Sequence, residues 1–246
     1  MKLTFIGHSS YLIDTGDRYI LFDYYRDSVD APSLGEILPR PGDPLYIFCT
    51  HSHGDHFSRK VFDLPVGDRP IRYIFHSEVA DAVPKKQSAQ VLFVDTEESF
   101  SVDKHICGRA YGSTDLGGSF YVEIKVPNDR PSFTLFHAGD LNNWHWNEEA
   151  NDYYINLYET AYREELERFG RHPIAPELLM FPTDYRLGKD YLKGLKQFLE
   201  IAPCRYLAPM HLNGKPKHAP ELSALCDKYN IRLLFPEREG ITFDIE

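Results

Sequence analysis

The stretch T-H-S-H-G-D-H at positions 50–56 places four potential metal ligands within six residues: His51, His53, Asp55 and His56. Imidazole nitrogens and carboxylate oxygens are ligands that zinc and similar divalent metals accept in proteins. His51 and His53 are two residues apart, so their side chains leave an extended backbone on the same face. Gly54 permits a tight turn that brings Asp55 and His56 towards the same point. The stretch therefore predicts a metal site, and the alternative is a polar loop whose histidines are unrelated.

Two later segments end in the same types of residue. The apolar run at 133–136 enters H-A-G-D, which ends in Asp140, and the run at 206–209 leads to His211. The glycine before Asp140 lets the backbone turn, so that its carboxylate can project over the sheet edge and bridge two divalent ions. Taken singly, Asp140 could cap a helix or turn, and His211 could be an ordinary loop histidine. With the 45–49 run that precedes the first stretch, they predict three strand ends at one edge of a sheet.

Three further residues at strand ends are interpreted as supporting groups. Asp23 follows the apolar run at 19–22 and can orient a metal-bound histidine. Asp184 follows the run at 178–182 and is expected to hold a ligand histidine in the same way. His8 follows the first strand and is interpreted as a packed or hydrogen-bonded loop histidine that reaches the site only as support.

Aromatic and charged residues follow two of these strand ends. Trp144 and Trp146 are the only two tryptophans in the chain, and they flank His145. They are interpreted as a hydrophobic anchor for the next helix. The alternative is that Trp144 or Trp146 lines a substrate pocket while His145 acts as a catalytic acid on a leaving group. Arg186 and Lys189 either clamp an anionic group of the substrate or form a solvated helix entrance.

Hydrophobic periodicity defines the elements that must position these residues. Residues 147–169 carry apolar side chains at spacings of three and four, which is typical of an amphipathic helix. The other predicted helices are 58–64, 78–83, 190–201 and 220–229. The predicted strands are 3–6, 11–14, 18–23, 45–49, 71–76, 91–94, 99–102, 105–111, 119–126, 131–137, 178–182, 206–209, 233–235 and 241–245. The long segment at 24–44 is expected to be a loop that covers part of the molecule.

Composition and charge limit the classes of partner. The 246 residues are 42% apolar and 14% aromatic and show no repeat or linker, so we expect one domain over residues 1–246. The net charge of −10 makes nucleic acid an unlikely partner, because phosphate binding needs clustered Lys and Arg. A small anionic substrate is still compatible with this charge, because bound metal ions can dominate the local field.

The four cysteines are far apart and form no C-x-x-C motif: Cys49, Cys107, Cys204 and Cys226. They predict reduced, buried thiols in a cytoplasmic protein. No apolar run is long enough to cross a bilayer, so no membrane partner is expected. The apolar residues at 3–6 are too few for a signal peptide.

The three motifs T-H-S-H-G-D-H, F-H-A-G-D and P-M-H resemble those of the metallo-β-lactamase-fold hydrolases. The opening G-H-S-S-Y-L-I-D is similar to the branch that includes ascorbate-6-phosphate lactonase-like proteins. The resemblance spans essentially the whole chain. It implies an α/β fold, an αβ/βα four-layer sandwich of two mixed β-sheets with helices on the outer faces and metals in a cleft between the sheets.

The resemblance also implies a ligand set. His51 and His53 would hold a first metal, and a second metal would be held by Asp55, His56 and His211, with Asp140 bridging. The family normally supplies another histidine to the first metal, but residues 110–118 contain none. Asp115 is the best replacement, because a carboxylate oxygen is an accepted zinc ligand. One or two Zn²⁺ ions per chain are expected, with Mn²⁺ and Fe left open.

The implied activity is hydrolysis by a metal-activated water, with Asp55 or Asp140 as the catalytic group that orients the water. The superfamily covers lactonases, thioesterases, phosphodiesterases, nucleases and β-lactamases, so we expect a small ester, lactone or phosphodiester substrate. Two alternatives remain. One is a nuclease or RNA-processing enzyme on the same fold, and the other is a non-catalytic metal-binding protein. The sequence leaves the oligomeric state open.

Overall fold

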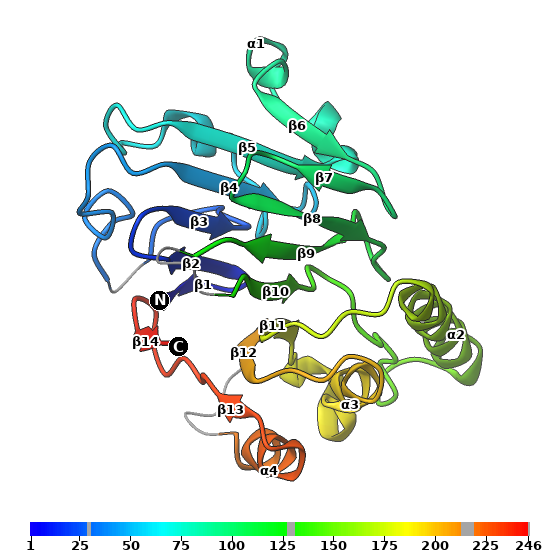
Figure 1. The fold of residues 1–246 in the computed structure, drawn as a ribbon. Helices are drawn as coiled ribbons and strands as arrows, with labels where there is room; N and C mark the ends of the chain where they lie inside the picture. The colour runs from blue at the N-terminus through cyan, green and yellow to red at the C-terminus, as the bar shows by residue number, and fades with distance from the viewer. Residues whose placement is uncertain (29–30, 127–130, 213–218, 246) are drawn as a thin grey trace.

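The computed structural model describes residues 1–28, 31–126, 131–212 and 219–245. Two seven-stranded β-sheets, each containing parallel and antiparallel strands, share one hydrophobic core (Figure 1). This architecture confirms the predicted α/β sandwich of two mixed sheets. Each predicted strand is present, with its ends shifted by at most two residues. The predicted loop at 24–44 includes positions 29–30, which lie outside the described residues.

Sheet A combines the first strands of the chain with the last one. Its order is β14 (Thr242–Asp244), β1 (Lys2–Gly7), β2 (Ser10–Asp14), β3 (Tyr19–Phe22), β4 (Leu45–Cys49), β5 (Ile71–His76) and β6 (Val91–Val94). The pairs from β14 to β3 are antiparallel, and those from β3 to β6 are parallel. Two antiparallel steps separate β1 from β3, so β1 runs in the same direction as β3, β4 and β5. The carboxyl ends of these four strands therefore lie at one edge of sheet A.

Sheet B repeats this mixture with the middle of the chain. Its order is β13 (Arg232–Leu233), β12 (Tyr206–Met210), β11 (Leu178–Pro182), β10 (Phe133–His137), β9 (Ser119–Ile124), β8 (Ile106–Tyr111) and β7 (Ser99–Ser101). The pairs from β13 to β10 are parallel, and those from β10 to β7 are antiparallel. The carboxyl ends of β10, β11 and β12 consequently share one edge of sheet B.

Strand β4 is buried on both faces, which explains its unbroken apolar sequence. Successive side chains of a strand point to opposite faces. Tyr46 and Phe48 accordingly join the core between the sheets, whereas Leu45, Ile47 and Cys49 pack on the outer face of sheet A. Each fully buried side chain of this size stabilises the fold by about 1.5–3 kcal/mol relative to an exposed one. The histidine-rich stretch thus begins at the end of a firmly held strand.

Helices cover the two sheets unequally (Figure 1). Sheet B is accompanied by α2 (Asp152–Arg171), 3₁₀ helix η3 (Tyr185–Asp190), α3 (Lys193–Leu199) and α4 (Pro220–Tyr229). Sheet A carries shorter pieces: 3₁₀ helices η1 (Arg59–Asp63) and η2 (Ser77–Asp81) and α1 (Lys85–Ser88). The predicted helices at 58–64 and 78–83 are therefore 3₁₀ turns. Pro84 follows η2 and is the N-cap residue of α1.

Helix α2 begins later than predicted. Its first residue is Asp152 rather than residue 147, because Asn151 is extended and its side chain accepts a hydrogen bond from the Tyr154 amide. Such an N-cap satisfies one of the backbone donors that a helix start leaves without a partner. The predicted apolar face is buried only in the second half of the helix, and Tyr154 and Leu157 are 49% and 50% exposed.

The segment at 24–44 covers the outer face of sheet A. Leu34 and Leu38 are buried there in the same cluster as residues of β3 and β4. The segment is thus a cover, as its length predicted, for this apolar face. The two chain ends meet beside it on sheet A, where the Met1 amine donates a hydrogen bond of 2.9 Å to the Ile245 carbonyl (Figure 1).

Candidate metal centre

Histidines from both sheets surround the Asp140 carboxylate. Asp140 Oδ1 lies 2.8 Å from His211 Nε2 and 3.1 Å from His56 Nε2. Asp140 Oδ2 lies 3.4 Å from His51 Nε2. All four side chains are buried. The structure therefore brings together the ends of β4, β10 and β12. They come from two sheets, however, and not from one edge of a single sheet as the motif pattern predicted.

His53 and Asp115 lie on the open side of this cluster. His53 Nδ1 is 3.1 Å from His51 Nε2 and 4.0 Å from Asp115 Oδ2. His53, Asp115 and Asp140 offer ligand atoms that all lie within 4.8 Å of one another. His53 and Asp115 are 46% and 52% exposed in their side chains. Asp115 thus lies beside His53, where a substitute ligand was predicted.

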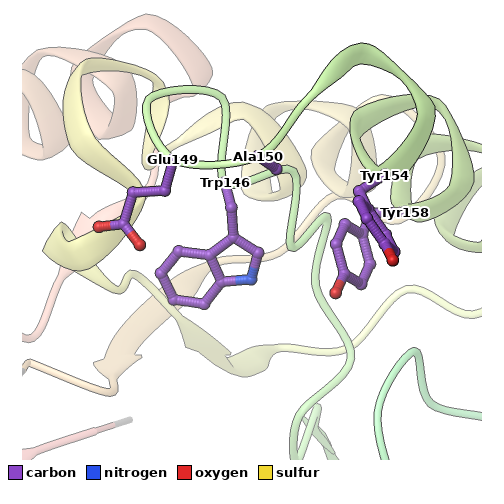
Figure 2. A pocket seen from close by; sticks show the side chains of 5 residues that line it. All are labelled: Trp146, Glu149, Ala150, Tyr154 and Tyr158. Atoms are coloured by element: carbon purple, nitrogen blue, oxygen red, sulfur yellow. The ribbon is translucent and has the colours of Figure 1, made fainter.

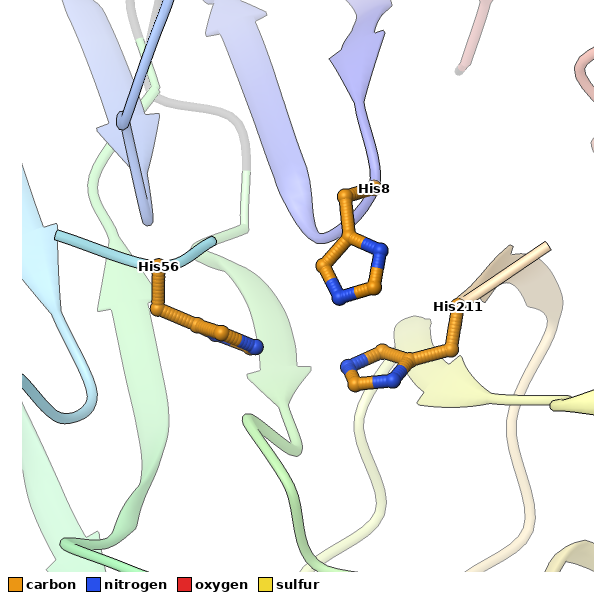
Figure 3. A group of neighbouring side chains, drawn as sticks. All are labelled: His8, His56 and His211. Atoms are coloured by element: carbon orange, nitrogen blue, oxygen red, sulfur yellow. The ribbon is translucent and has the colours of Figure 1, made fainter. Parts of the chain in front are cut away.

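His8 lies on the opposite side of the cluster. Its ring centroid is 4.0 Å from that of His211 and 5.4 Å from that of His56 (Figure 3). His8, His56 and His211 form a second group with ligand atoms within 4.8 Å of one another. The sequence predicted only a supporting role for His8, although His8 follows a strand end just as His51 and His211 do. The missing signal was the direction of β1, which two antiparallel pairings set.

Asp55 is held against His8. Its Oδ2 atom lies 3.2 Å from His8 Nε2, and its side chain is 54% exposed. The pKa of Asp55 lies below its usual range, mainly because of this contact with His8. The structure therefore places the predicted ligand Asp55 at the exposed rim of the cluster.

Asp23 holds the orientation of two histidines of the cluster, His51 and His56. Its carboxylate accepts hydrogen bonds from the Thr50 amide (2.8 Å), the Thr50 hydroxyl (2.7 Å) and His56 Nδ1 (2.8 Å). Because the Thr50 hydroxyl donates to Asp23, it accepts the 3.0 Å hydrogen bond from His51 Nδ1. Both histidines then carry their proton on Nδ1 and turn a bare Nε2 towards Asp140. Asp23 therefore lies where it can orient both histidines, and its predicted part in supporting a metal ligand stays a prediction.

His137 lies next to Asp23 but faces away from Asp140. Its Nδ1 accepts a hydrogen bond from the Gly139 amide (3.2 Å), so Nε2 donates to the Ser9 carbonyl (2.9 Å). The ring stacks on Phe22 at 4.8 Å. Burial lowers the pKa of His137. This neutral histidine therefore supports the turn that carries Asp140.

Asp184 plays a comparable part for His211. Asp184 Oδ2 lies 3.7 Å from His211 Nδ1, and the carboxylate accepts hydrogen bonds from Arg186 Nε (3.0 Å) and Nη2 (2.5 Å). Burial would raise the pKa of Asp184, but the contacts with His211 and Arg186 lower it to about 2. Arg186 is thus engaged by Asp184. Lys189, the other predicted clamp residue, is exposed, and its backbone amide donates to Glu148.

Glycines allow two loops to approach the ligands closely. Gly117 has φ +65°, and a Cβ atom there would lie 2.2 Å from the Thr50 carbonyl oxygen and 2.6 Å from His51 Cβ. Gly139 has φ +54°, and a Cβ atom there would lie 2.9 Å from Thr50 Cβ. Other residues rarely adopt this backbone conformation and would collide here. Both positions require glycine for the 112–118 loop and the Asp140 turn to close on β4.

The cluster contains buried polar atoms that its own residues leave without hydrogen bonds. Among the described residues, atoms of this kind include His8 Nε2, His56 Nε2, His211 Nδ1, His211 Nε2 and Asp140 Oδ1. Buried polar groups are normally satisfied, so a convergent set of this kind calls for a ligand. Bare imidazole nitrogens around a carboxylate form a donor set suited to zinc, manganese or iron. The residues present therefore fit a divalent metal.

The electrostatics of the cluster favour a bound cation. Burial lowers the pKa of His56, but the carboxylates of Asp140 and Asp23 outweigh it and raise that pKa to about 10. The pKa of His211 is raised as well, mainly by Asp140 against the effect of burial. Asp140 itself has a pKa well below its usual range because the histidines outweigh its burial. The negative field that would hold protons on these rings also attracts a metal ion.

The predicted aromatic residues divide into two kinds. Trp144 is buried, donates Nε1–H to the Asp140 carbonyl (2.8 Å), and has its ring 5.7 Å from that of His211. Trp146 is half-buried and stacks on Trp144 at 6.0 Å. His145 is buried and uses both ring nitrogens on backbone groups, with Nδ1 accepting from the Asn147 amide (3.1 Å) and Nε2 donating to the Asp190 carbonyl (3.2 Å). His145 therefore anchors the turn before α2, and its catalytic role stays a prediction.

The two mixed sheets and the histidine–aspartate cluster at their edges define the class, a protein of the metallo-β-lactamase fold. Residues 2–152 match the family described as Beta-lactamase superfamily domain, and the chain belongs to that family. A UPF0173 metal-dependent hydrolase from Korarchaeum cryptofilum is 24% identical over 223 residues, which cover 90% of each chain. A second one, from Opitutus terrae, is 23% identical over 235 residues, covering 88% of this chain and 87% of the relative.

Solved structures show the same fold at low sequence identity. Igni18, a metallo hydrolase from Ignicoccus hospitalis, has a TM-score of 0.65 at 16% identity and covers 100% of this chain and 99% of its own. The isothiocyanate hydrolase from Delia radicum gut bacteria has a TM-score of 0.58 at 16% identity, covering 100% and 99%. CmlA, a diiron β-hydroxylase from Streptomyces venezuelae, has 0.60 at 11% identity, covering 99% of this chain and 54% of that one. The resemblance to metallo-β-lactamase-fold hydrolases is confirmed, whereas the lactonase branch and the choice of zinc stay predictions.

Proposed function

We propose that the protein hydrolyses a small ester, lactone or phosphodiester with the help of one or two divalent metal ions, of which Zn²⁺ is the first candidate. The observation that carries this proposal is the set of bare imidazole nitrogens around Asp140. A structural cluster would satisfy these buried atoms internally. A catalytic metal centre leaves ligand atoms available and keeps one side open to substrate.

Two ligand groups share the central carboxylate. Among the described residues, those that would hold the metal form three overlapping groups: His53, Asp115 and Asp140 on the open side, His51, His56 and Asp140 in the buried centre, and His8, His56 and His211 on the other side. When bound, a divalent cation supplies Lewis acidity, which lowers the pKa of water and polarises the bond to be cleaved. With Asp115 in the place of a histidine, the open-side group is richer in oxygen, which favours weaker zinc binding or a harder metal.

The protein's own residues prepare the centre for this chemistry. Asp23 and Asp184 orient the ligand histidines, so little rearrangement is needed on metal binding. Asp55 lies at the exposed rim and is ionised at neutral pH, with its pKa held below the usual range mainly by the contact with His8. From there its carboxylate can accept a hydrogen bond from the attacking water and orient it.

The partner in this proposal is a small molecule. The net charge of −10 disfavours polynucleotide binding. No helix among the described residues is long and apolar enough to cross a membrane. The cytoplasmic location, the single domain over 1–246 and the absence of a nucleic-acid partner stay predictions from sequence.

A substrate screen with metal removal tests the proposal. Lactone, thioester and phosphodiester substrates are offered to the purified protein before and after chelation, and again after Zn²⁺ or Mn²⁺ is restored. We expect turnover of at least one class, its loss on chelation and its recovery with metal. His56→Ala serves as the inactive comparison. Turnover that survives full metal removal would contradict the proposal.

A further inference from the structure

A cavity of about 410 Å³ opens between the segment after β10 and the start of α2 (Figure 2). Its lining residues are Trp146, Glu149, Ala150, Tyr154 and Tyr158. In Figure 2 the Trp146 ring and the two tyrosine rings extend from the backbone on either side of the space. A volume of this size suits a small organic group.

Two ring contacts connect this cavity to the candidate metal centre. Trp146 stacks on Trp144 with an interplanar angle of 15°. The Trp144 ring in turn lies 5.7 Å from the His211 ring, and its Nε1–H is bonded to the Asp140 carbonyl. The cavity wall is therefore joined to the cluster through two packed indole rings.

Trp146 is held in an unusual backbone conformation. Its φ is +46°, in the left-handed region that favours glycine. Such strain persists where the surrounding structure imposes it, and it is enriched at ligand-binding positions. Here it presents a half-buried indole at the cavity wall, next to the anchored Trp144.

The charges around the cavity favour a cation. Glu149 is the one charged lining residue, and no described side chain pairs with it. Arg186 lies 5.8 Å from the Trp146 ring, but its charge is balanced by the hydrogen bonds to Asp184. The start of α2 would attract anions, yet Asn151 caps it and Asp152 places a carboxylate in its first turn. An anionic group would find no compensating charge among the described residues of the lining.

Aromatic rings and a carboxylate together recognise organic ammonium groups. The ring faces of Trp and Tyr attract a cation, by about two- to fivefold in affinity for each ring at exposed sites. Glu149 adds a direct charge interaction at the cavity edge. An uncharged ligand of the same size gains only the apolar contact.

We propose that this cavity is a recognition pocket for a cationic organic group, such as an alkylated ammonium, on the substrate. The assignment of the bound molecule as substrate rests on the proposed hydrolase function. The binding itself depends only on the cavity and is measurable in protein stripped of metal. A failed substrate screen and a failed binding test are therefore separate results.

Intrinsic fluorescence gives a direct readout, because Trp144 and Trp146 are the only tryptophans in the chain. Metal-free protein is titrated with three probes: benzyltrimethylammonium, benzyl alcohol and phenylacetate. We expect the cation to change the emission with an affinity at least about tenfold higher than that of the alcohol, since several rings and Glu149 act together. Phenylacetate should bind more weakly than the alcohol. Equal affinity for cation and alcohol, or tightest binding of phenylacetate, would overturn the proposal.

Variants assign the effect to the lining residues. Glu149→Gln should weaken binding of benzyltrimethylammonium about three- to tenfold and leave benzyl alcohol unchanged. Tyr158→Ala should weaken the cation about two- to fivefold. Glu164→Gln, an exposed charge change on α2 outside the lining, is the matched control and should have no effect. If Glu149→Gln and Glu164→Gln behave alike, the pocket does not select cations.

Discussion

Asp23 is the residue through which the ligand histidines are held together. It is fully buried and bonds to His56 and, through Thr50, to His51. Asp23→Asn keeps the shape of the side chain but removes the charge that stabilises both Nδ1 protons. We expect metal affinity to fall about 10- to 100-fold, as for other groups that orient ligands. Calorimetric metal titration checks this, with the exposed Asp81→Asn as control, and equal affinities in both variants would argue against the role.

Asp115 is the candidate ligand that distinguishes the open side of the cluster from its buried side. Its Oδ2 atom lies 4.0 Å from His53 Nδ1, on the open side of the cluster. Asp115→Ala should lose about one metal ion per chain in elemental analysis, because the open-side group then keeps too few ligands. Asp115→His should retain that metal. An unchanged metal content in Asp115→Ala would show that Asp115 is not a ligand.

The cysteines give a pH-dependent prediction. Burial raises the pKa of the Cys204 and Cys226 thiols to about 12. The thiolate is the reactive form, and below the pKa its fraction falls tenfold with each pH unit. Labelling of these two residues in the native protein should therefore be slow at pH 8 and rise about tenfold per unit towards pH 11. Complete labelling of all four cysteines within minutes at pH 8 without denaturant would be inconsistent with this burial.

Sequence reasoning located most of the cluster but not its full membership. His51, His53, His56, Asp140 and His211 come together as their strand ends predicted. The contribution of His8 depends on the direction in which β1 runs, which no local pattern encodes. Residue type alone could not predict that Asp55 lies against His8 at the rim, or that both ring nitrogens of His145 bond to backbone groups. These contacts depend on how the surrounding backbone folds.

At the scale of elements, glycines set how closely the loops approach β4. Gly117 and Gly67 have similar φ values, +65° and +70°, but a Cβ atom at Gly67 meets nothing within 4 Å. Gly67→Ala should lower the free energy of unfolding by about 1–2 kcal/mol, from backbone strain alone. Gly117→Ala should cost more and also weaken metal binding, because its Cβ displaces His51. The free energy of unfolding and the metal affinity of the two variants are measured by denaturant unfolding and metal titration. Identical results would show that the close approach of Gly117 to His51 has no effect.

The helical elements show where periodicity misleads. The apolar spacing of α2 predicted one buried face from residue 147 onward, yet its first turns leave Tyr154 half exposed. Those turns border the cavity beside Trp146 instead of the core. The pattern that indicates burial in a core is the same as that of an aromatic pocket wall, since both need large apolar side chains at helical spacing.

At the scale of the molecule, the centre depends on the two sheets keeping their relative position. Tyr11 of β2 donates a buried hydrogen bond of 2.8 Å to the Pro209 carbonyl of β12, two residues before His211. Tyr11→Phe should lower the free energy of unfolding by about 1–3 kcal/mol, because a buried carbonyl loses its donor. Urea unfolding measures this, with the exposed Tyr153→Phe as control. A loss no larger than in the control would mean that this bond does not couple the sheets.

The metal content of the purified protein tests the central claim most directly. Wild type and His56→Ala, prepared without chelator, are compared by elemental analysis. His56 belongs to both buried ligand groups, with His51 and Asp140 on one side and His8 and His211 on the other. We predict about one or two divalent ions per wild-type chain and a clear loss in His56→Ala. Wild type with almost no metal, or a variant that retains the full amount, would contradict the assignment of this cluster as a metal centre.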